Sequence, residues 1–274
     1  MAAGRLTPLA GVLGFAAGAA LAWGHFEAGW ARLQTLDCEL PRLPAELDGL
    51  RIAHLSDFHL GVPSRGAKAI ERAIAWVRDR NPDAVLITGD LLSRRGGEAR
   101  LRSLVDGLPN CFAVLGNHDY GLSRDPFAEP TAVYDLGTAT LLADDARTLE
   151  LNGRRVQIVG LDPRSYRRGT SRPSSLADPD ADLRILLCHY PYVIRRLEPG
   201  VFDLVLAGHL HAGQICVPWP GGRIPLAHPR WRDFHGLYGE RAAMLHVSAG
   251  LGTTFVPFRF LARPEATELT LRST

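Results

Sequence analysis

The sequence predicts an α/β fold in which two mixed β-sheets pack together and helices cover their outer faces. Three observations predict this fold. Short apolar runs of strand length recur along the chain, helical stretches separate the first of these runs, and polar residues follow many of them. A chain of 274 residues suits one large domain of this class. We therefore expect one large domain with polar side chains gathered at its strand ends.

Strands and helices alternate in the first half of this domain. The expected elements, in order, are a strand over residues 50–56, a helix over 67–80, a strand over 84–88, a helix over 99–108 and a strand over 111–115. Asn81 and Pro82 should end the first helix, because proline disfavours a helical conformation of the residue before it. This alternation predicts a β-α-β unit with parallel strands.

Strands predominate in the second half. They are expected over residues 154–161, 183–188, 204–207, 244–247 and 267–271. The segment 162–182 is rich in arginine, serine and proline, and we expect it to be a mobile loop. Since the connections between these later strands are less helical, the sequence favours two mixed sheets over one parallel sheet.

The amino-terminal segment differs from the rest of the chain. Residues 6–24 contain no charged side chain, and this run is close to the ~20 residues that span a bilayer. We expect residues 1–46 to be a membrane anchor or signal segment with a linker, and residues 47–274 to be the catalytic domain. The favoured localisation is the cell membrane, through a single N-terminal anchor on an undetermined side. Because small residues surround Leu21, a cleaved export signal is the alternative, and a buried helix is a third.

Composition and charge disfavour several classes of protein. The net charge of +2 argues against strong attraction to nucleic acid, so a nucleic-acid partner is not expected. The four cysteines have no C-x-x-C spacing, which gives no support to a zinc knuckle or a redox motif. Apolar and charged fractions of 46% and 22% fit a folded globular chain rather than a disordered or polytopic membrane protein.

Metal-ligand residue types follow five of the predicted strands. They are Asp57 with His59, Asp90, Asn117 with His118, His189, and His209 with His211. Ligands in α/β sheets gather at the carboxyl ends of strands, so we expect these side chains to meet. Oxygen and imidazole donors in this number suit two divalent cations rather than one. Asp90 is the candidate bridge, because a shared carboxylate would keep two ions ~3.5–4 Å apart.

These motifs, in this order, resemble those of the calcineurin-like metallophosphoesterases. The matching motifs are Asp57-x-His59, Gly89-Asp90, Gly116-Asn117-His118-Asp119, His189 and Gly208-His209-x-His211. One bacterial, membrane-associated branch of the family has similar motifs at two further places, Gly213-Gln214 and a tail from Gly250 through Arg259 to Glu265. The resemblance extends to UDP-2,3-diacylglucosamine pyrophosphatases. The resemblance implies a four-layer αββα sandwich, in agreement with two packed sheets flanked by helices.

The resemblance also implies a ligand set for each of two divalent ions. Because three to four imidazoles enter these sets, manganese, zinc or iron is expected rather than calcium. One ion would be held by Asp57, His59, Asp90 and His211, and the other by Asp90, Asn117, His189 and His209. His118 matches the family histidine that donates a proton or hydrogen bond to the leaving-group oxygen. Asp119 is expected to support His118 as its partner.

The function implied by the resemblance is a dinuclear metal-dependent hydrolase of phosphoesters. We expect a phosphodiester or pyrophosphate linkage in a small-molecule or lipid substrate related to the membrane or cell envelope. The alternatives are a nuclease-like phosphodiesterase and a membrane-anchored, non-catalytic metal-binding protein. Aromatic candidates for contact with acyl chains are Trp219, Trp231, Phe255, Phe258 and Phe260. The oligomeric state is left open.

Other histidines are not assigned to this site. His54 lies within the pattern of the first strand and His246 within that of a later strand, so both are expected to be core histidines with satisfied hydrogen bonds. His25, His228 and His235 are expected at the surface. Burial and hydrogen bonding in the structure test these assignments.

Overall fold

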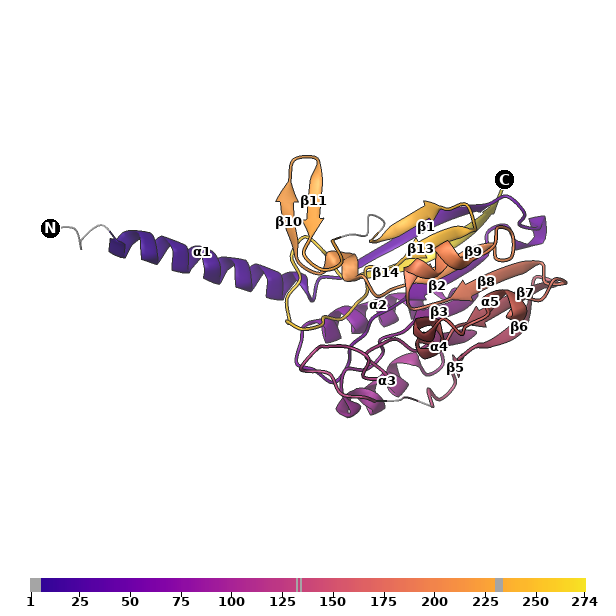
Figure 1. Ribbon diagram of the computed structural model, residues 1–274, viewed down its shortest axis with the longest axis horizontal. Coiled ribbons are helices and arrows are strands. Elements are labelled where there is room, and N and C mark those ends of the chain that lie inside the picture. The colour runs from indigo at the N-terminus through magenta and orange to yellow at the C-terminus, as the bar shows by residue number, and fades with distance from the viewer. Residues whose placement is uncertain (1–5, 132, 134, 230–233) are drawn as a thin grey trace.

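Two six-stranded sheets form the centre of the computed structural model, which describes residues 6–131, 133, 135–229 and 234–274 (Figure 1). The first sheet has the order β1 (Arg32–Leu40), β14 (Glu265–Ser273), β2 (Arg51–Leu55), β3 (Ala84–Thr88), β4 (Cys111–Val114) and β5 (Thr140–Leu141). β2 to β5 run parallel, and β14 is antiparallel to β2. The sheet is therefore mixed, as predicted.

The second sheet is mixed as well. Its order is β12 (Gly236–Gly239), β13 (Met244–Val247), β9 (Leu204–Ala207), β8 (Leu183–Leu187), β7 (Arg154–Gly160) and β6 (Asp145–Leu151). The four central strands are parallel, and both edge strands pair antiparallel. A separate hairpin of β10 (Cys216–Trp219) and β11 (Gly222–Pro225) projects from the domain (Figure 1).

The main core lies between the two sheets. Because side chains alternate along a strand, Ile52 and His54 of β2 face the second sheet, whereas Ala53 and Leu55 face away from it. Ile185 and Leu206 belong to the same inter-sheet cluster from the opposite side. The two sheets thus share one apolar layer, and their outer faces remain for helices to cover.

Helices cover both outer faces. α2 (Gly66–Arg80) and α3 (Glu98–Val105) pack on the first sheet, and Ile70, Ile74 and Val77 of α2 are buried against it. The spacing of these residues gives α2 one apolar face. On the second sheet lie α4 (Pro163–Arg168), α5 (Pro173–Leu176) and the 3₁₀ helix Pro191–Arg196. The predicted arrangement, in which helices cover the outer faces of two packed mixed sheets, is confirmed.

Several elements were not predicted. β1 lies in the segment that the sequence analysis treated as a linker, and β5, β6, β10, β11 and β12 were also missed. The segment 162–182, expected to be a loop, contains α4 and α5. Asp162 caps α4 by accepting a hydrogen bond from the backbone N–H of Arg164, and Pro163 is its first residue. These are ordinary helix-start signals in a helix too short to show a periodic pattern.

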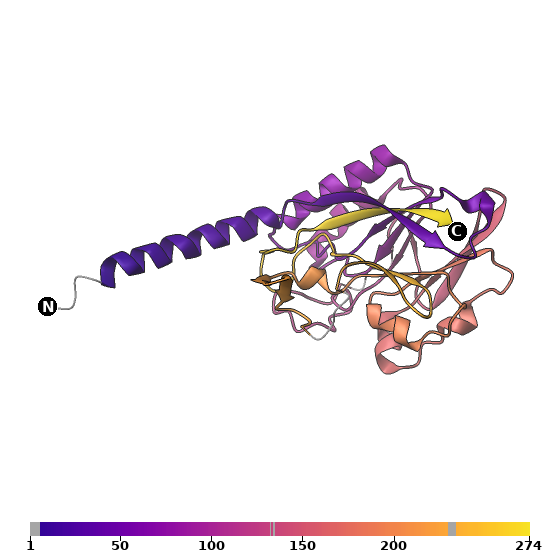
Figure 2. The ribbon, with the colours of Figure 1, turned by 90° about the horizontal axis from the view of Figure 1, so that it is seen from above.

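α1 (Leu6–Glu27) extends away from the domain, and its carboxyl-terminal end contacts it (Figures 1 and 2). The Gly24 carbonyl accepts from the backbone N–H of Arg259 at 3.0 Å, and the Glu27 carboxylate accepts from those of Leu261 and Ala262 at 3.1 and 2.7 Å. Within the described part of the chain, no helix combines the length and apolarity that crossing a membrane requires.

Candidate metal centre

The predicted ligand side chains all lie just beyond strand ends. Asp57 and His59 follow β2, Asp90 follows β3, Asn117 follows β4, His189 follows β8, and His209 and His211 follow β9. Because β2 to β4 belong to one sheet and β8 and β9 to the other, the site lies where corresponding edges of the two sheets meet. His209 is half-buried and the other six residues are buried.

Backbone conformation separates most of these residues from ordinary strand ends. Asp57, His59, Asp90, His209 and His211 have positive φ angles of 54°, 50°, 53°, 76° and 49°. A residue other than glycine with such a φ angle stores ~1–3 kcal/mol of backbone strain, and strained residues of this kind cluster at functional sites. Hydrogen bonds across the strand ends hold this backbone conformation in place. The Asp57 N–H donates to the Gly89 carbonyl and the His59 N–H to the Asp90 carbonyl, each at 2.9 Å.

The first group consists of Asp57, His59, Asp90 and His211, whose ligand atoms lie within 4.8 Å of one another. His211 Nε2 is 3.2 Å from Asp57 Oδ1 and 3.1 Å from His59 Nε2. His59 Nε2 is 3.6 Å from Asp90 Oδ2. Two carboxylates and two imidazoles therefore converge on one point.

The second group consists of Asp90, His189 and His209, with Asn117 beside them. His189 Nε2 lies 3.3 Å from Asp90 Oδ2, 3.1 Å from Asn117 Oδ1 and 3.1 Å from His209 Nδ1. Asp90 thus belongs to both groups, which is the position required of a bridging carboxylate.

The donor atoms fit metal ions. Two ligands that each lie ~2.1 Å from one ion, at an angle of about 90–110°, are ~3.0–3.4 Å apart. The contacts of His211 with Asp57 and of His189 with Asp90, at 3.2 and 3.3 Å, fall in this range. His189 Nδ1 lies 2.8 Å from the Thr88 carbonyl, which places a proton on Nδ1 and leaves the lone pair of Nε2 for a metal.

Two glycines leave the space that the carboxylates occupy. A Cβ atom at Gly116 would overlap Asp90 Oδ1, and a Cβ atom at Gly208 would overlap Asp57 Oδ2. Gly116 directly precedes Asn117, and Gly208 directly precedes His209. The glycine in each motif is thus required by close approach of the chain to a carboxylate.

A family model described as calcineurin-like phosphoesterase matches residues 50–213. The matched segment contains every residue of the two groups. The chain belongs to the calcineurin-like phosphoesterases. It is therefore a metallophosphoesterase, a hydrolase of phosphate esters, and its buried cluster of Asp and His residues suggests two divalent metals.

Related phosphoesterases match most of the chain. The metallophosphoesterase YkuE of Bacillus subtilis is 30% identical over 85% of this chain and 82% of its own length. The UDP-2,3-diacylglucosamine pyrophosphatase LpxG of Chlamydia trachomatis is 28% identical over 88% of this chain and 89% of its own. A transmembrane protein with metallophosphoesterase domain from Danio rerio is 31% identical over 87% of this chain and 57% of its own length. The solved structure of a dimetal phosphatase from Danio rerio aligns over 74% of this chain and 88% of its own, with 11% identity and a TM-score of 0.41.

Electrostatic interactions keep most ligand groups of the phosphoesterase in metal-binding forms. Burial opposes ionisation of Asp57 and Asp90, but the facing histidines outweigh it and hold the pKa of both carboxyls below the usual value. Burial lowers the pKa of His59 and His209, so both rings are neutral. For His189, Asp90 outweighs burial and raises the pKa to about 9. A bound cation would displace that proton.

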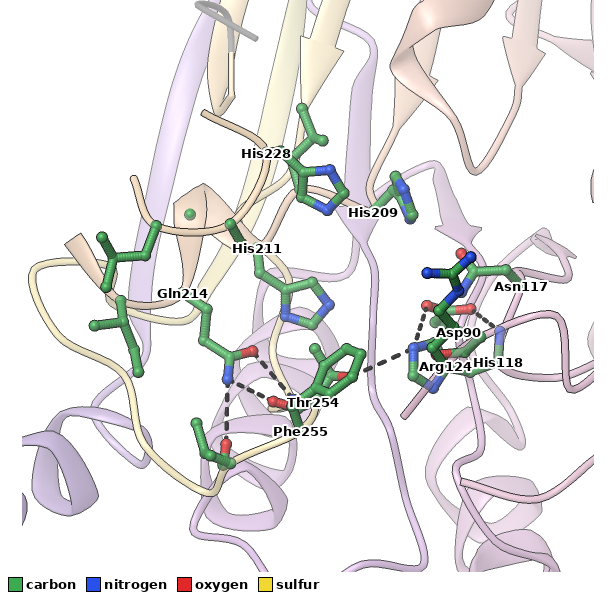
Figure 3. Close-up of a pocket in the computed structure, with 17 residues that line it drawn as sticks. Asp90, Asn117, His118, Arg124, His209, His211, Gln214, His228, Thr254 and Phe255 are labelled. Carbon is green, nitrogen blue, oxygen red and sulfur yellow. Dashed lines mark hydrogen bonds and ion pairs between the residues drawn. The ribbon is translucent and has the colours of Figure 1, made fainter. Parts of the chain in front are cut away.

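His118 lies beside the two groups and belongs to neither. Its Nε2 is 4.0 Å from Asp90 Oδ2, and its backbone N–H donates to Asp90 Oδ1 at 2.8 Å. Burial lowers the pKa of the ring, and the opposing charge of Asp90 only partly offsets this effect. The ring lines a cavity together with Asp90 (Figure 3), so it is placed to face a phosphate held at the cluster.

The hydrogen bonds of Asp119 go to the backbone rather than to His118. Its carboxylate accepts from the N–H groups of Leu91, Leu92 and Gly116, at 3.2, 2.9 and 2.8 Å. Burial raises the pKa of this carboxyl to about 7. The geometry therefore does not support the expected partnership between Asp119 and His118. Asp119 instead fixes the turn after β3, which carries Asp90.

A cavity of about 330 Å³ opens directly beside the cluster (Figure 3). Its polar walls include Asp90, Asn117, His118, His209 and His211, and its apolar walls include Leu210, Ile215, Leu226, Phe255 and Val256. A second cleft of about 540 Å³ shares Asn117 and His209 with this cavity, and its other walls include Tyr166, Arg167, Tyr190, Tyr192 and Arg196. The candidate metal-binding cluster thus adjoins one largely apolar space and one space lined by tyrosine and arginine.

Several residues around the cavity were not predicted from the sequence. His228 was expected at the surface, but it is half-buried, and its ring centre lies 4.8 Å from that of His209. Thr254 lies close to His118, and no local pattern indicated it. Of the aromatic candidates, Trp219 and Phe255 are exposed, Phe258 and Phe260 are half-buried, and Trp231 lies outside the described residues. These residues could not be predicted because their segments come close to the cavity only when the chain folds.

Proposed function

We propose that this metallophosphoesterase hydrolyses a phosphodiester or pyrophosphate that joins an apolar group to a polar one, in a substrate taken from a membrane. The observation that carries the proposal is the largely apolar cavity that opens on the metal-binding cluster. An alkyl or acyl group bound between Leu226, Phe255 and Val256 would lie directly beside a phosphate at the cluster.

The second cleft suits the polar part of such a substrate. Its arginines, Arg167 and Arg196, are exposed and can pair with anionic oxygens. Tyr166 and Tyr190 stack with ring centres 5.1 Å apart and offer an aromatic wall. The name of the relative LpxG, a UDP-2,3-diacylglucosamine pyrophosphatase, describes for that protein a substrate with a polar and an acylated part.

The proposed mechanism assigns a role to each part of the site. Asp57, His59, Asp90 and His211 would hold one ion, and Asp90, Asn117, His189 and His209 the other. Bound divalent ions would supply activation of water and neutralisation of charge on the phosphoryl oxygens. Asn117 is an uncharged ligand, which limits repulsion of an anionic substrate. His118 would donate a hydrogen bond or proton to the leaving oxygen. The imidazoles favour manganese, zinc or iron over calcium.

We further propose that α1 attaches the protein to a membrane. Its apolar side chains are exposed, with Val12 at 65%, Leu13 at 61% and Phe15 at 82%. Trp219 on the hairpin and Leu226 just after it are 63% and 60% exposed. Burying such surface in lipid is favourable, at about 25 cal/mol per Å². One relative is itself named a transmembrane protein.

Sedimentation with phospholipid vesicles tests the attachment. The full chain should sediment with the vesicles, whereas a chain that lacks residues 1–20 should stay in the supernatant. The shortened chain keeps Gly24 and Glu27, whose contacts with the segment 259–262 close the end of the domain. Equal binding of both chains would contradict a role for α1.

A pair of esters tests the substrate class. With Mn²⁺ present, octyl p-nitrophenyl phosphate should be a better substrate than methyl p-nitrophenyl phosphate. Because each buried CH₂ contributes about 0.8 kcal/mol, three buried groups would raise kcat/KM by roughly 50-fold. Phe255→Ser should reduce this preference, whereas Leu261→Ser, an exposed position on the same loop outside the cavity, should keep it. Equal use of both esters by the unmodified protein would contradict the apolar site.

A further inference from the structure

We propose that Thr254 and Asp125 orient the His118 ring through a chain of hydrogen bonds and keep a proton on its Nε2 atom, which faces the reaction centre. This inference rests on the proposed hydrolase function and deepens it. Thr254 and Asp125 belong to neither group of metal-ligand residues. They would act as positioning residues, and His118 would be the group that contacts the substrate.

The chain of contacts is continuous. Thr254 Oγ1 lies 2.9 Å from Asp125 Oδ2 and 3.4 Å from His118 Nε2. The second distance is long for a hydrogen bond, so the contact between Thr254 and His118 is weak. Asp125 and His118 are buried, with 7% and 4% of their surfaces exposed. Thr254, which is half-buried, and His118 both line the cavity (Figure 3), so the chain of contacts that starts at Asp125 ends there.

The direction of the hydrogen bonds follows from the chemistry of the groups. An ionised carboxylate only accepts, so the single hydroxyl proton of Thr254 is donated to Asp125. This bond is charge-assisted, and at 2.9 Å it is closer than the 3.4 Å contact with the ring, which favours it over donation to a neutral ring. Thr254 then offers His118 only a lone pair. Nε2 must carry a proton to complete the chain.

The other ring nitrogen supports the same assignment. His118 Nδ1 is buried and meets no hydrogen-bond partner among the residues that the structure describes. A proton on Nδ1 would be a buried donor without an acceptor, which costs about 1–3 kcal/mol. Nε2, by contrast, lies 4.0 Å from Asp90 Oδ2, beside both groups of ligands. The favoured tautomer therefore carries its proton on Nε2, and the long contact with Thr254 leaves this proton available to the leaving oxygen of a bound phosphate.

Neighbouring hydrogen bonds hold the chain in place. The Gln214 side chain fixes the backbone of Thr254, because Nε2 of Gln214 donates to the Thr254 carbonyl at 2.7 Å and Oε1 accepts from its N–H at 3.1 Å. Asp125 also accepts from the backbone N–H groups of Phe127 and Phe255, each at 2.9 Å. The hydroxyl of Thr254 is thus held between two loops and connects them to His118.

Kinetics on two matched esters test the chain. Methyl phenyl phosphate needs help from an acid when phenolate leaves, whereas methyl p-nitrophenyl phosphate needs little. With Mn²⁺ bound, Thr254→Val should lower kcat on the phenyl ester by roughly 3- to 10-fold, the scale of one hydrogen bond, and leave KM and the p-nitrophenyl ester nearly unchanged. Thr254→Ser should restore the lost activity, because serine keeps the hydroxyl.

Thr253→Val is the matched control. Thr253 is buried on the same loop, and its hydroxyl contacts Ser64 Oγ at 2.7 Å rather than His118. This variant should leave the ratio between the two esters unchanged. An equal loss on both esters in Thr254→Val, or no loss on either, would overturn the inference. If the unmodified protein with Mn²⁺ hydrolyses neither these esters nor octyl p-nitrophenyl phosphate, the proposed function itself fails.

Nitrogen NMR of the histidine rings gives a second readout. In the Zn²⁺-loaded protein at mildly alkaline pH, where imidazole is neutral, the His118 signals should show the proton on Nε2. Thr254→Val should shift the population toward Nδ1, and Thr254→Ser should not. If Thr254→Val fails to fold, Thr254→Ala replaces it in both measurements. A His118 proton on Nδ1 in the unmodified protein would overturn the inference.

Discussion

Two sets of buried histidines differ in their position relative to the strands. His54 and His246 lie within β2 and β13 and face each other across the core, with their Nδ1 atoms 2.7 Å apart. The ligand histidines lie just beyond strand ends, and they are His59, His189, His209 and His211. Both sets are largely shielded from solvent. Position at a strand end, rather than burial, is therefore the feature that separates the candidate metal ligands from the core histidines.

One of the candidate ligand histidines, His189, also differs from the core pair in charge. Burial lowers the pKa of His246 to about 3, and burial together with His246 lowers that of His54. Both rings are therefore neutral and serve packing and hydrogen bonding, as His54 does with Thr88 at 2.9 Å. At the strand ends, Asp90 instead raises the pKa of His189 to about 9. Asp90 thus draws a proton to this strand end, whereas in the core the weaker effect of Asp57 on the pKa of His54 does not outweigh burial.

The largest effect should come from Asp90→Ala. Because Asp90 belongs to both ligand groups, its loss should release both ions and lower kcat/KM by roughly 10³-fold or more. Elemental analysis and an assay with bis(p-nitrophenyl) phosphate would measure both changes. Asp79→Ala, at an exposed position on α2, is the control. Full metal content and turnover in the Asp90 variant would refute the bridge.

His118→Asn should come next. Since His118 is outside both ligand groups, the variant should keep its metals and lose roughly 10²-fold in kcat on methyl phenyl phosphate, within the usual range of general acid catalysis. The loss on methyl p-nitrophenyl phosphate should be much smaller. If both esters slow equally while the metals stay bound, His118 acts by electrostatic positioning of the phosphate instead.

His246→Leu should affect stability rather than chemistry. It leaves His54 Nδ1 without its partner in the core, which should lower the free energy of unfolding by up to about 3 kcal/mol. Metal content and kcat should stay near their original values. Urea unfolding of the metal-free protein measures the first effect. Loss of metal from this variant would show that the core pair also supports the centre.

The pH dependence of stability should report the same core pair. His246 has a pKa of about 3 in the fold, against ~6.5 in an unfolded chain, so the unfolded state binds more protons between these values. The contribution of His246 to the free energy of unfolding is therefore complete above about pH 6.5 and is lost as the pH falls. The loss should be about 2 kcal/mol between pH 7 and pH 5. Urea unfolding at both pH values should show a smaller loss for His246→Leu than for the unmodified protein.

Most of the candidate site was predictable from the sequence, because each candidate ligand lies within four residues of the end of an apolar run of strand length. The end of such a run is visible locally, and the meeting of strand ends then follows from the fold class. Thr254 and Asp125 were not predictable, because two irregular loops bring them to His118. Neither loop has a periodic pattern that fixes its path.

The fold was predictable to a similar extent. The buried central strands, such as β3 and β9, show as continuous apolar runs, whereas β1 mixes exposed and half-buried positions over most of its length. β1 is an edge strand whose partner, β14, lies at the other end of the chain. Its pairing depends on long-range contacts that a local pattern does not reveal.

Metal content tests the central claim most directly. The full-length protein, analysed after purification with Mn²⁺ or Zn²⁺, should contain about two ions per chain, as a dinuclear centre bridged by Asp90 requires. A chelator should remove the ions and the phosphodiesterase activity together, and added Mn²⁺ or Zn²⁺ should restore both. A metal-free protein that remains active, or full activity with a single ion bound, would contradict the account.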